Sequence, residues 1–141
     1  MASQTAQRFD LQLTSEPANI APARLAIEKF AADAGFTEPA VADLGLCLNE
    51  ALANIIRHAY SGEPGRPMTI SCEFDAGELT ISIRDWGNGR DPTETIRPHN
   101  PLVPGGLGMI CLRSLLDRAE FIPQPDGMLL IMGKRVTKGT T

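Results

Sequence analysis

The chain has 141 residues, a formal net charge of −4 and a sequence pI of about 5.1, and 43% of its residues are hydrophobic. This length suits a single domain with one core, and an acidic balance without long basic runs argues against nucleic acid as a partner. No apolar run approaches the roughly 18 residues of a membrane helix, and the first residues lack the basic and apolar regions of a secretory signal. We therefore expect a cytoplasmic protein with no membrane partner.

Hydrophobic periodicity predicts five strands and three helices. In chain order these are a strand at 8–14, helices at 20–30 and 37–60, strands at 68–74 and 79–86, a helix at 107–116, and strands at 119–122 and 128–136. Residues 87–106 are rich in proline and glycine, which is typical of a functional lid or a disordered insert. The pattern predicts one α+β domain at 8–136 with flexible tails at 1–7 and 137–141, in which about three helices cover one face of an antiparallel or mixed sheet.

The second predicted helix has an apolar stripe and a separate polar row. In the polar row, Glu50, Asn54 and His58 follow at i, i+4 and i+8. A carboxylate one turn from a carboxamide can place a proton acceptor beside a ligand for a hard metal ion. A solvated helix face with a chance Glu and Asn is the alternative reading at this point. The apolar stripe, which we expect to be buried, consists of Leu44, Cys47, Leu48, Ala51, Leu52 and Ile55.

Asp85 ends a predicted strand and is followed by Gly87 and Gly89. Such glycines let the backbone turn sharply and approach a ligand closely, and the carboxylate can accept a hydrogen bond from an amino group such as that of adenine. A plain turn uses the same residue types, so this motif alone leaves both readings open.

A second glycine motif, Gly105-Gly106-Leu107-Gly108, opens the third predicted helix. Exposed backbone N–H groups at a helix N-terminus favour an anion. No Gly-Lys-Ser/Thr follows, so the motif is not a P-loop. It is consistent with a phosphate site of another type.

The three cysteines, Cys47, Cys72 and Cys111, are far apart in apolar segments. Their odd number and their spacing fit neither a disulfide framework nor a zinc site. We expect all three to be small core residues.

Taken in order, these motifs resemble the GHKL ATPase superfamily. The stretches NEALANIIRHAY, DWGNGRDP and PGGLGMICLRSLLD and the closing Gly-Lys-Arg-Val strand are most similar to its small serine-kinase branch, the bacterial anti-sigma factors that act by partner switching. The resemblance covers roughly residues 8–136. It implies a two-layer α/β sandwich of the Bergerat type that binds ATP and Mg²⁺.

The resemblance also implies a role for each motif residue. Asn54 matches the magnesium ligand, Glu50 the carboxylate that accepts the proton of the attacking hydroxyl, and Asp85 the residue that reads the adenine amino group. The remaining implied nucleotide-binding residues are Gly87 and Gly89 beside the base, Gly105, Gly106, Leu107 and Gly108 at the phosphates, and Arg57 and His58 near phosphate oxygens.

The activity implied is that of an anti-sigma factor with protein-serine kinase activity. Its partners would be a sigma factor and a small STAS-type antagonist, which it phosphorylates on a Ser, and it would form a homodimer. Two positions depart from the branch: Met128 replaces the usual Thr beside the adenine pocket, and Arg90 stands where an apolar residue is more usual.

Two rival functions share this fold. A pure nucleotide-dependent binding protein would lack the base, so Glu50 argues against it. The catalytic half of a histidine kinase would need a separate phospho-accepting helix pair, which we do not expect before Arg8.

Overall fold

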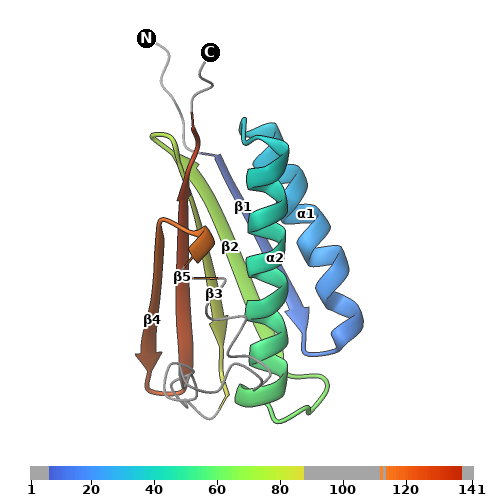
Figure 1. Ribbon diagram of the computed structural model, residues 1–141. Coiled ribbons are helices and arrows are strands. Elements are labelled where there is room, and N and C mark those ends of the chain that lie inside the picture. The colour runs from blue at the N-terminus through green and yellow to red at the C-terminus, as the bar shows by residue number, and fades with distance from the viewer. Residues whose placement is uncertain (1–6, 88–111, 113, 138–141) are drawn as a thin grey trace.

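The structure is a computed structural model that describes residues 7–87, 112 and 114–137. Five antiparallel strands form one sheet in the order β1-β2-β3-β5-β4, and two long helices cover one of its faces (Figure 1). The predicted α+β class is confirmed, with a sheet that is antiparallel throughout the described strands. The elements are β1 Gln7–Thr14, a 3-10 turn η1 Pro17–Asn19, α1 Ile20–Asp33, α2 Glu38–Asn54, a π-helical turn η2 Ile55–Ala59, β2 Pro67–Asp75, β3 Glu78–Asp85, β4 Arg118–Gln124 and β5 Gly127–Arg135.

The third predicted helix lies mostly outside the described residues. Within it, Leu112, Ser114 and Leu115 are helical. Leu112 is 1% exposed and belongs to the same core cluster as the buried residues of α2, so this side chain lies on the side of the sheet that α2 covers.

Helix α1 is three residues longer than predicted, and a glycine follows its C-terminal end. Gly35 has a φ of +106°, the amide of Gly35 donates to the Ala32 carbonyl and the amide of Phe36 donates to the Ala31 carbonyl, each at 3.1 Å. These two bonds make a Schellman motif, in which glycine avoids the steric cost of the left-handed conformation. The link to α2 is therefore fixed by local sequence.

Helix α2 is the centre of the core. Thr37 caps its N-terminus, with its hydroxyl accepting from the Ala40 amide at 3.4 Å. All six residues of the predicted apolar stripe are buried, and they pack against the inward side chains of β2 and β3. Cys47 and Cys72 are buried in the core, as predicted, and burial raises the pKa of Cys72 to about 12.

The last turn of this helix is a π-turn, which the sequence did not indicate. The amide of Tyr60 donates to the Ile55 carbonyl at 3.0 Å, an i→i+5 bond that replaces the usual i→i+4 bond. Because the turn is wider, residues after Asn54 leave the straight polar row expected for a continuous α-helix. Ile55 and Ile56 are both buried, whereas Arg57 is exposed.

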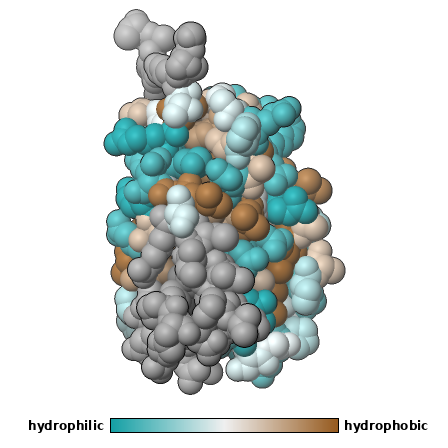
Figure 2. Space-filling view, in the orientation of Figure 1, coloured by the Kyte–Doolittle hydropathy of each residue, from teal (hydrophilic) through white to brown (hydrophobic). Residues whose placement is uncertain are grey.

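The helical segment Glu38–Ala59 is long and apolar enough in composition to cross a membrane, although 44% of that window is buried in the fold. A helix at the core of a globular domain has the same composition. Figure 2 shows hydrophilic side chains interspersed with hydrophobic ones over the surface seen in the orientation of Figure 1. The burial of its stripe against the sheet therefore identifies α2 as a core helix.

Strands β2 and β3 form an antiparallel hairpin through a tight turn at Ala76 and Gly77. Both residues have positive φ, 53° and 82°, as a two-residue type I′ turn requires. The left-handed conformation costs a residue other than glycine roughly 1–2 kcal/mol, and Asn tolerates it better than Ala. We therefore expect Ala76→Asn to raise the free energy of unfolding by about 0.5–1 kcal/mol in urea denaturation.

The same substitution at Ala42, which is exposed in the second turn of α2, serves as the control. Asn is a poorer helix former than Ala, so Ala42→Asn should lower the free energy of unfolding by about 0.5 kcal/mol. A loss of stability at both positions would contradict a strained conformation at Ala76.

Candidate functional site

The C-terminal ends of α2 and β3 lie at the same end of the molecule (Figure 1). Each carries one predicted site residue, Asn54 on α2 and Asp85 on β3, and their side chains line one cavity. They are 8% and 3% exposed, and apart from the aromatic Tyr60 the described residues contain one other buried side chain with an oxygen or nitrogen atom, that of Ser15. Since burying a polar side chain is costly unless it has partners, two buried polar residues on one cavity make this cavity the candidate site.

The Asp85 carboxylate is held by backbone groups. Its Oδ1 accepts from the Gly87 amide at 2.9 Å. Burial raises the pKa of Asp85 above its usual range, while hydrogen bonds from the Gly87 and Met128 amides and the charge of Arg84 act in the opposite direction. The carboxylate is thus a buried acceptor with a fixed orientation.

Two glycines allow neighbouring segments to approach Asp85. A Cβ on Gly87 would lie 2.5 Å from the carbonyl oxygen of Ala59, at the end of the π-turn. A Cβ on Gly127 would lie 1.9 Å from the carbonyl oxygen of Asp85, and Gly127 also has a φ of +139°. Gly87, a predicted site residue, is therefore required for close packing of the helix end against the turn after β3.

The other predicted residues of the helix lie around Asn54. Glu50 is half-buried one turn earlier on α2. Arg57 is exposed, and its Nη2 donates to Asn54 Oδ1 at 3.4 Å. His58 is half-buried in η2, where the π-turn takes it out of line with Glu50 and Asn54. Glu50, Arg57 and His58 are not among the described residues that line the cavity.

The remaining predicted site residues, Gly89, Gly105, Gly106, Leu107 and Gly108, lie outside the described residues, as does Arg90. Their assignment to phosphate binding and to the lid remains a prediction from the sequence.

The cavity also has an apolar lining that the motifs did not indicate. Met128 faces Asp85 across the β3–β5 ladder, and its buried side chain takes the position discussed above as a departure from the usual Thr. Phe121 of β4 could have been suspected only from its alternation in a short strand. The complete described lining is Ala51, Asn54, Ile55, Asp85, Leu112, Phe121, Met128 and Leu130.

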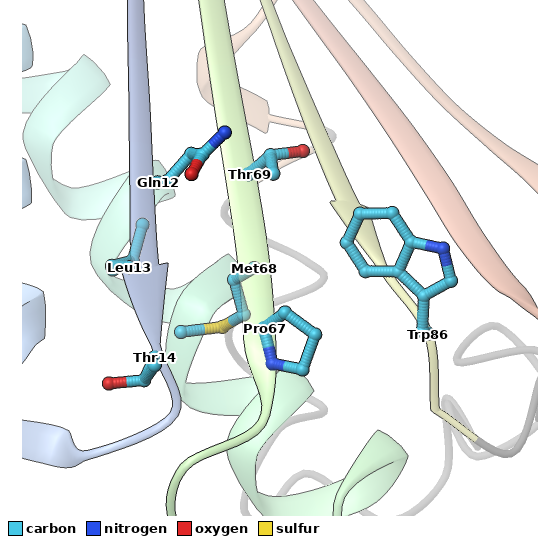
Figure 3. A pocket seen from close by; sticks show the side chains of 7 residues that line it. All are labelled: Gln12, Leu13, Thr14, Pro67, Met68, Thr69 and Trp86. Atoms are coloured by element: carbon cyan, nitrogen blue, oxygen red, sulfur yellow. The ribbon is translucent and has the colours of Figure 1, made fainter.

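A wider groove, with a volume of about 620 Å³, lies at the same end of the sheet but is lined by other residues. Figure 3 shows Gln12 and Thr69 on the neighbouring strands β1 and β2, and the Trp86 ring at the end of β3. The Trp86 ring stacks on the Arg84 guanidinium, with 4.6 Å from Cζ to the ring centroid. No residue of the predicted site lines this groove in the described part of the chain.

The chain matches known proteins along nearly its whole length. The family model for the histidine kinase-like ATPase domain matches residues 13–134. A protein named serine-protein kinase RsbW from Listeria innocua is 26% identical, over 93% of this chain and 88% of the relative. A protein named anti-sigma F factor from Oceanobacillus iheyensis is 30% identical, over 94% of this chain and 95% of the relative.

Among solved structures, the RsbU and RsbW domains of Rv1364c from Mycobacterium tuberculosis match with a TM-score of 0.70. The match has 14% sequence identity and covers 92% of this chain but 32% of the solved chain, so it supports the fold alone. With the family model matching most of the sequence, the chain belongs to the family of histidine kinase-like ATPase domains.

Proposed function

We propose that this protein is an anti-sigma factor and an ATP-dependent protein-serine kinase. It would hold a sigma factor inactive and phosphorylate a Ser on a small STAS-type antagonist that competes with sigma. The observation that carries the proposal is the convergence of buried Asn54 and Asp85 on one cavity in a fold whose relatives are named serine-protein kinase and anti-sigma factor.

Asp85 is suited to reading adenine. Its buried carboxylate accepts N–H groups, and an exocyclic amino group is such a donor. The cavity beside it has a volume of about 20 Å³, room for about one water molecule. We therefore expect the apolar side chains of the lining to move when the base enters.

Asn54 is suited to holding Mg²⁺, since its amide oxygen is a hard ligand on a helix that the core fixes in place. One protein oxygen fits the preference of Mg²⁺ for phosphates and water as its other ligands. The bound ion would neutralise charge on the phosphates.

Glu50 is suited to act as the base. It lies one helical turn before Asn54 and is half-buried, so its carboxylate can accept the proton of the attacking Ser hydroxyl while Asn54 holds the nucleotide. The addition of a phosphate to the antagonist would then weaken a close contact by charge.

The remaining features of the proposed function rest on the resemblance to the relatives. These are a homodimeric state, a cytoplasmic location, and partners that are proteins instead of nucleic acid or membrane.

The test uses the full chain, ATP labelled on its γ-phosphate, Mg²⁺ and a STAS-type protein recovered with the tagged chain. We expect label to appear on one Ser of that protein, identified by mass spectrometry, and we expect the labelled form to dissociate. Mg-ATP-dependent retention of a sigma factor without any transfer would favour the pure binding protein, and failure to bind ATP would exclude both.

A further inference from the structure

The pairing of β3 with β2 ends at Asp85, so the next residue, Trp86, is not part of the ladder. In the β2–β3 ladder Met68 pairs with Asp85, so the following pair would be Pro67 with Trp86. Proline has no amide hydrogen, so it cannot donate to the Trp86 carbonyl. The backbone groups of Trp86 therefore need partners from elsewhere.

Tyr60 supplies one of these partners. Its hydroxyl accepts a hydrogen bond from the Trp86 amide at 2.8 Å and donates one to the Pro67 carbonyl at 2.5 Å. The hydroxyl is thus inserted between the two strands where a direct backbone hydrogen bond would otherwise form. Burial raises the pKa of Tyr60, so the hydroxyl keeps the proton that it donates.

Arg66 supplies the other partner. Its Nη2 donates to the Trp86 carbonyl at 3.3 Å, and its guanidinium lies 4.6 Å from the centre of the Tyr60 ring. Both backbone groups of Trp86 are therefore bound by side chains that also contact each other.

Tyr60 links the two side chains that hold Trp86, its own and that of Arg66, to the helix that carries Asn54. Tyr60 is 2% exposed and directly follows the π-turn that begins after Asn54. The Trp86 peptide groups lie between Asp85 and Gly87, whose amide donates to the Asp85 carboxylate. Fixing Trp86 thus fixes the carboxylate of Asp85 relative to the helix that carries Asn54.

We propose that Tyr60 and Arg66 are positioning residues of the nucleotide site, which clamp the main chain of Trp86 and so orient Asp85 towards a bound adenine. The inference rests on the proposed function, because it assigns Asp85 to the base. Neither residue needs to touch the nucleotide.

The test compares ATP affinity by calorimetry in the wild type, Tyr60→Phe and Arg66→Met. Tyr60→Phe keeps the ring and removes the hydroxyl, leaving the Trp86 N–H and the Pro67 C=O without this partner. We expect the affinity for ATP to be about tenfold weaker. Arg66 is 41% exposed at its side chain, so Arg66→Met should fold even if Tyr60→Phe does not, and we expect a loss of about threefold.

Thr37→Ala is the matched control, because it also removes a hydroxyl that accepts a hydrogen bond from a backbone amide, but at the opposite end of the same helix. It should lower the free energy of unfolding by as much as the loss of an N-cap residue usually does, and it should leave the affinity for ATP unchanged. The single tryptophan, Trp86, reports on the clamp without nucleotide. Its emission should shift in Tyr60→Phe and in Arg66→Met, and remain as in the wild type in Thr37→Ala.

A double-mutant cycle separates positioning from general destabilisation. In an Asp85→Asn background, Tyr60→Phe should cost little further affinity, because the group it orients has already been replaced. The inference is overturned if both clamp variants bind ATP as tightly as the wild type, or if Tyr60→Phe costs the same factor with and without Asp85. If the wild type binds no ATP, the proposed function is wrong, and the inference, which depends on it, is wrong as well.

Discussion

Glu50→Gln is expected to slow phosphate transfer to the antagonist by about 10²–10⁴-fold while ATP binding and sigma binding survive. The amide of Gln cannot accept the hydroxyl proton, and it is nearly the same size as the carboxylate. Glu50 is half-buried beside a buried Asn54, so its charge would face the phosphates and contributes little to holding them. Single-turnover transfer at saturating Mg-ATP measures the chemical step directly.

Two further variants make this result specific. Glu38→Gln places the same substitution in the first turn of the same helix, about 18 Å away along the axis, and should transfer at the wild-type rate. Asn54→Ala should lose Mg-ATP binding together with transfer, because it removes the proposed ligand. Wild-type transfer by Glu50→Gln would show that the base is another group.

Much of the fold could be predicted because the sequence patterns that specify its helices and turns lie within short segments of the chain. The stripe of α2 has the period of a helix, and every member is buried. Gly35 ends α1 with a positive φ, and the two residues between β2 and β3 adopt a tight hairpin turn. Each of these depends on residues that are close in sequence, where propensity and capping decide the conformation.

The order of the strands and the π-turn could not be predicted in this way. Strand β3 pairs with β5, with β4 at the edge, which depends on contacts between residues distant in sequence. The π-turn places Ile55 and Ile56 in the core and brings Tyr60 to the end of the sheet. Helical periodicity within Leu44–Tyr60 gives no sign of one wider turn, because tertiary packing selects it.

For the site, the motifs singled out Asn54 and Asp85, each at the end of a well-formed element, and both residues line one cavity. Their roles in nucleotide binding stay predictions. The motifs did not indicate the supporting residues. Tyr60 and Arg66 act through hydrogen bonds to a peptide group at the end of a ladder, and this requirement arises from Pro67 on another strand. The roles of Glu50, Arg57 and His58 are still predictions.

Asp85→Asn is the second change with a large expected effect. It keeps the shape of the side chain but replaces one acceptor oxygen by a donor and removes the charge. Since hydrogen bonds to charged groups contribute about 1.5–3 kcal/mol, affinity for both ATP and ADP should fall roughly 10- to 100-fold in calorimetry. Asp33→Asn, an exposed carboxylate on α1, is the control and should bind as the wild type does.

The same variant should change how stability depends on pH. Burial raises the folded-state pKa of Asp85 above its ordinary value of 3.8, so above that pH the unfolded chain loses this proton more readily than the folded chain does. The wild type therefore loses stability relative to Asp85→Asn as pH rises from about 3.8 to the folded-state pKa, and the difference is constant above it. Urea denaturation of the nucleotide-free proteins between pH 3 and 8 measures this difference. A difference that shifts in favour of the wild type as pH rises would mean that the carboxylate is stabilised as a charge, and the reading of Asp85 as a buried acceptor kept for its ligand would be wrong.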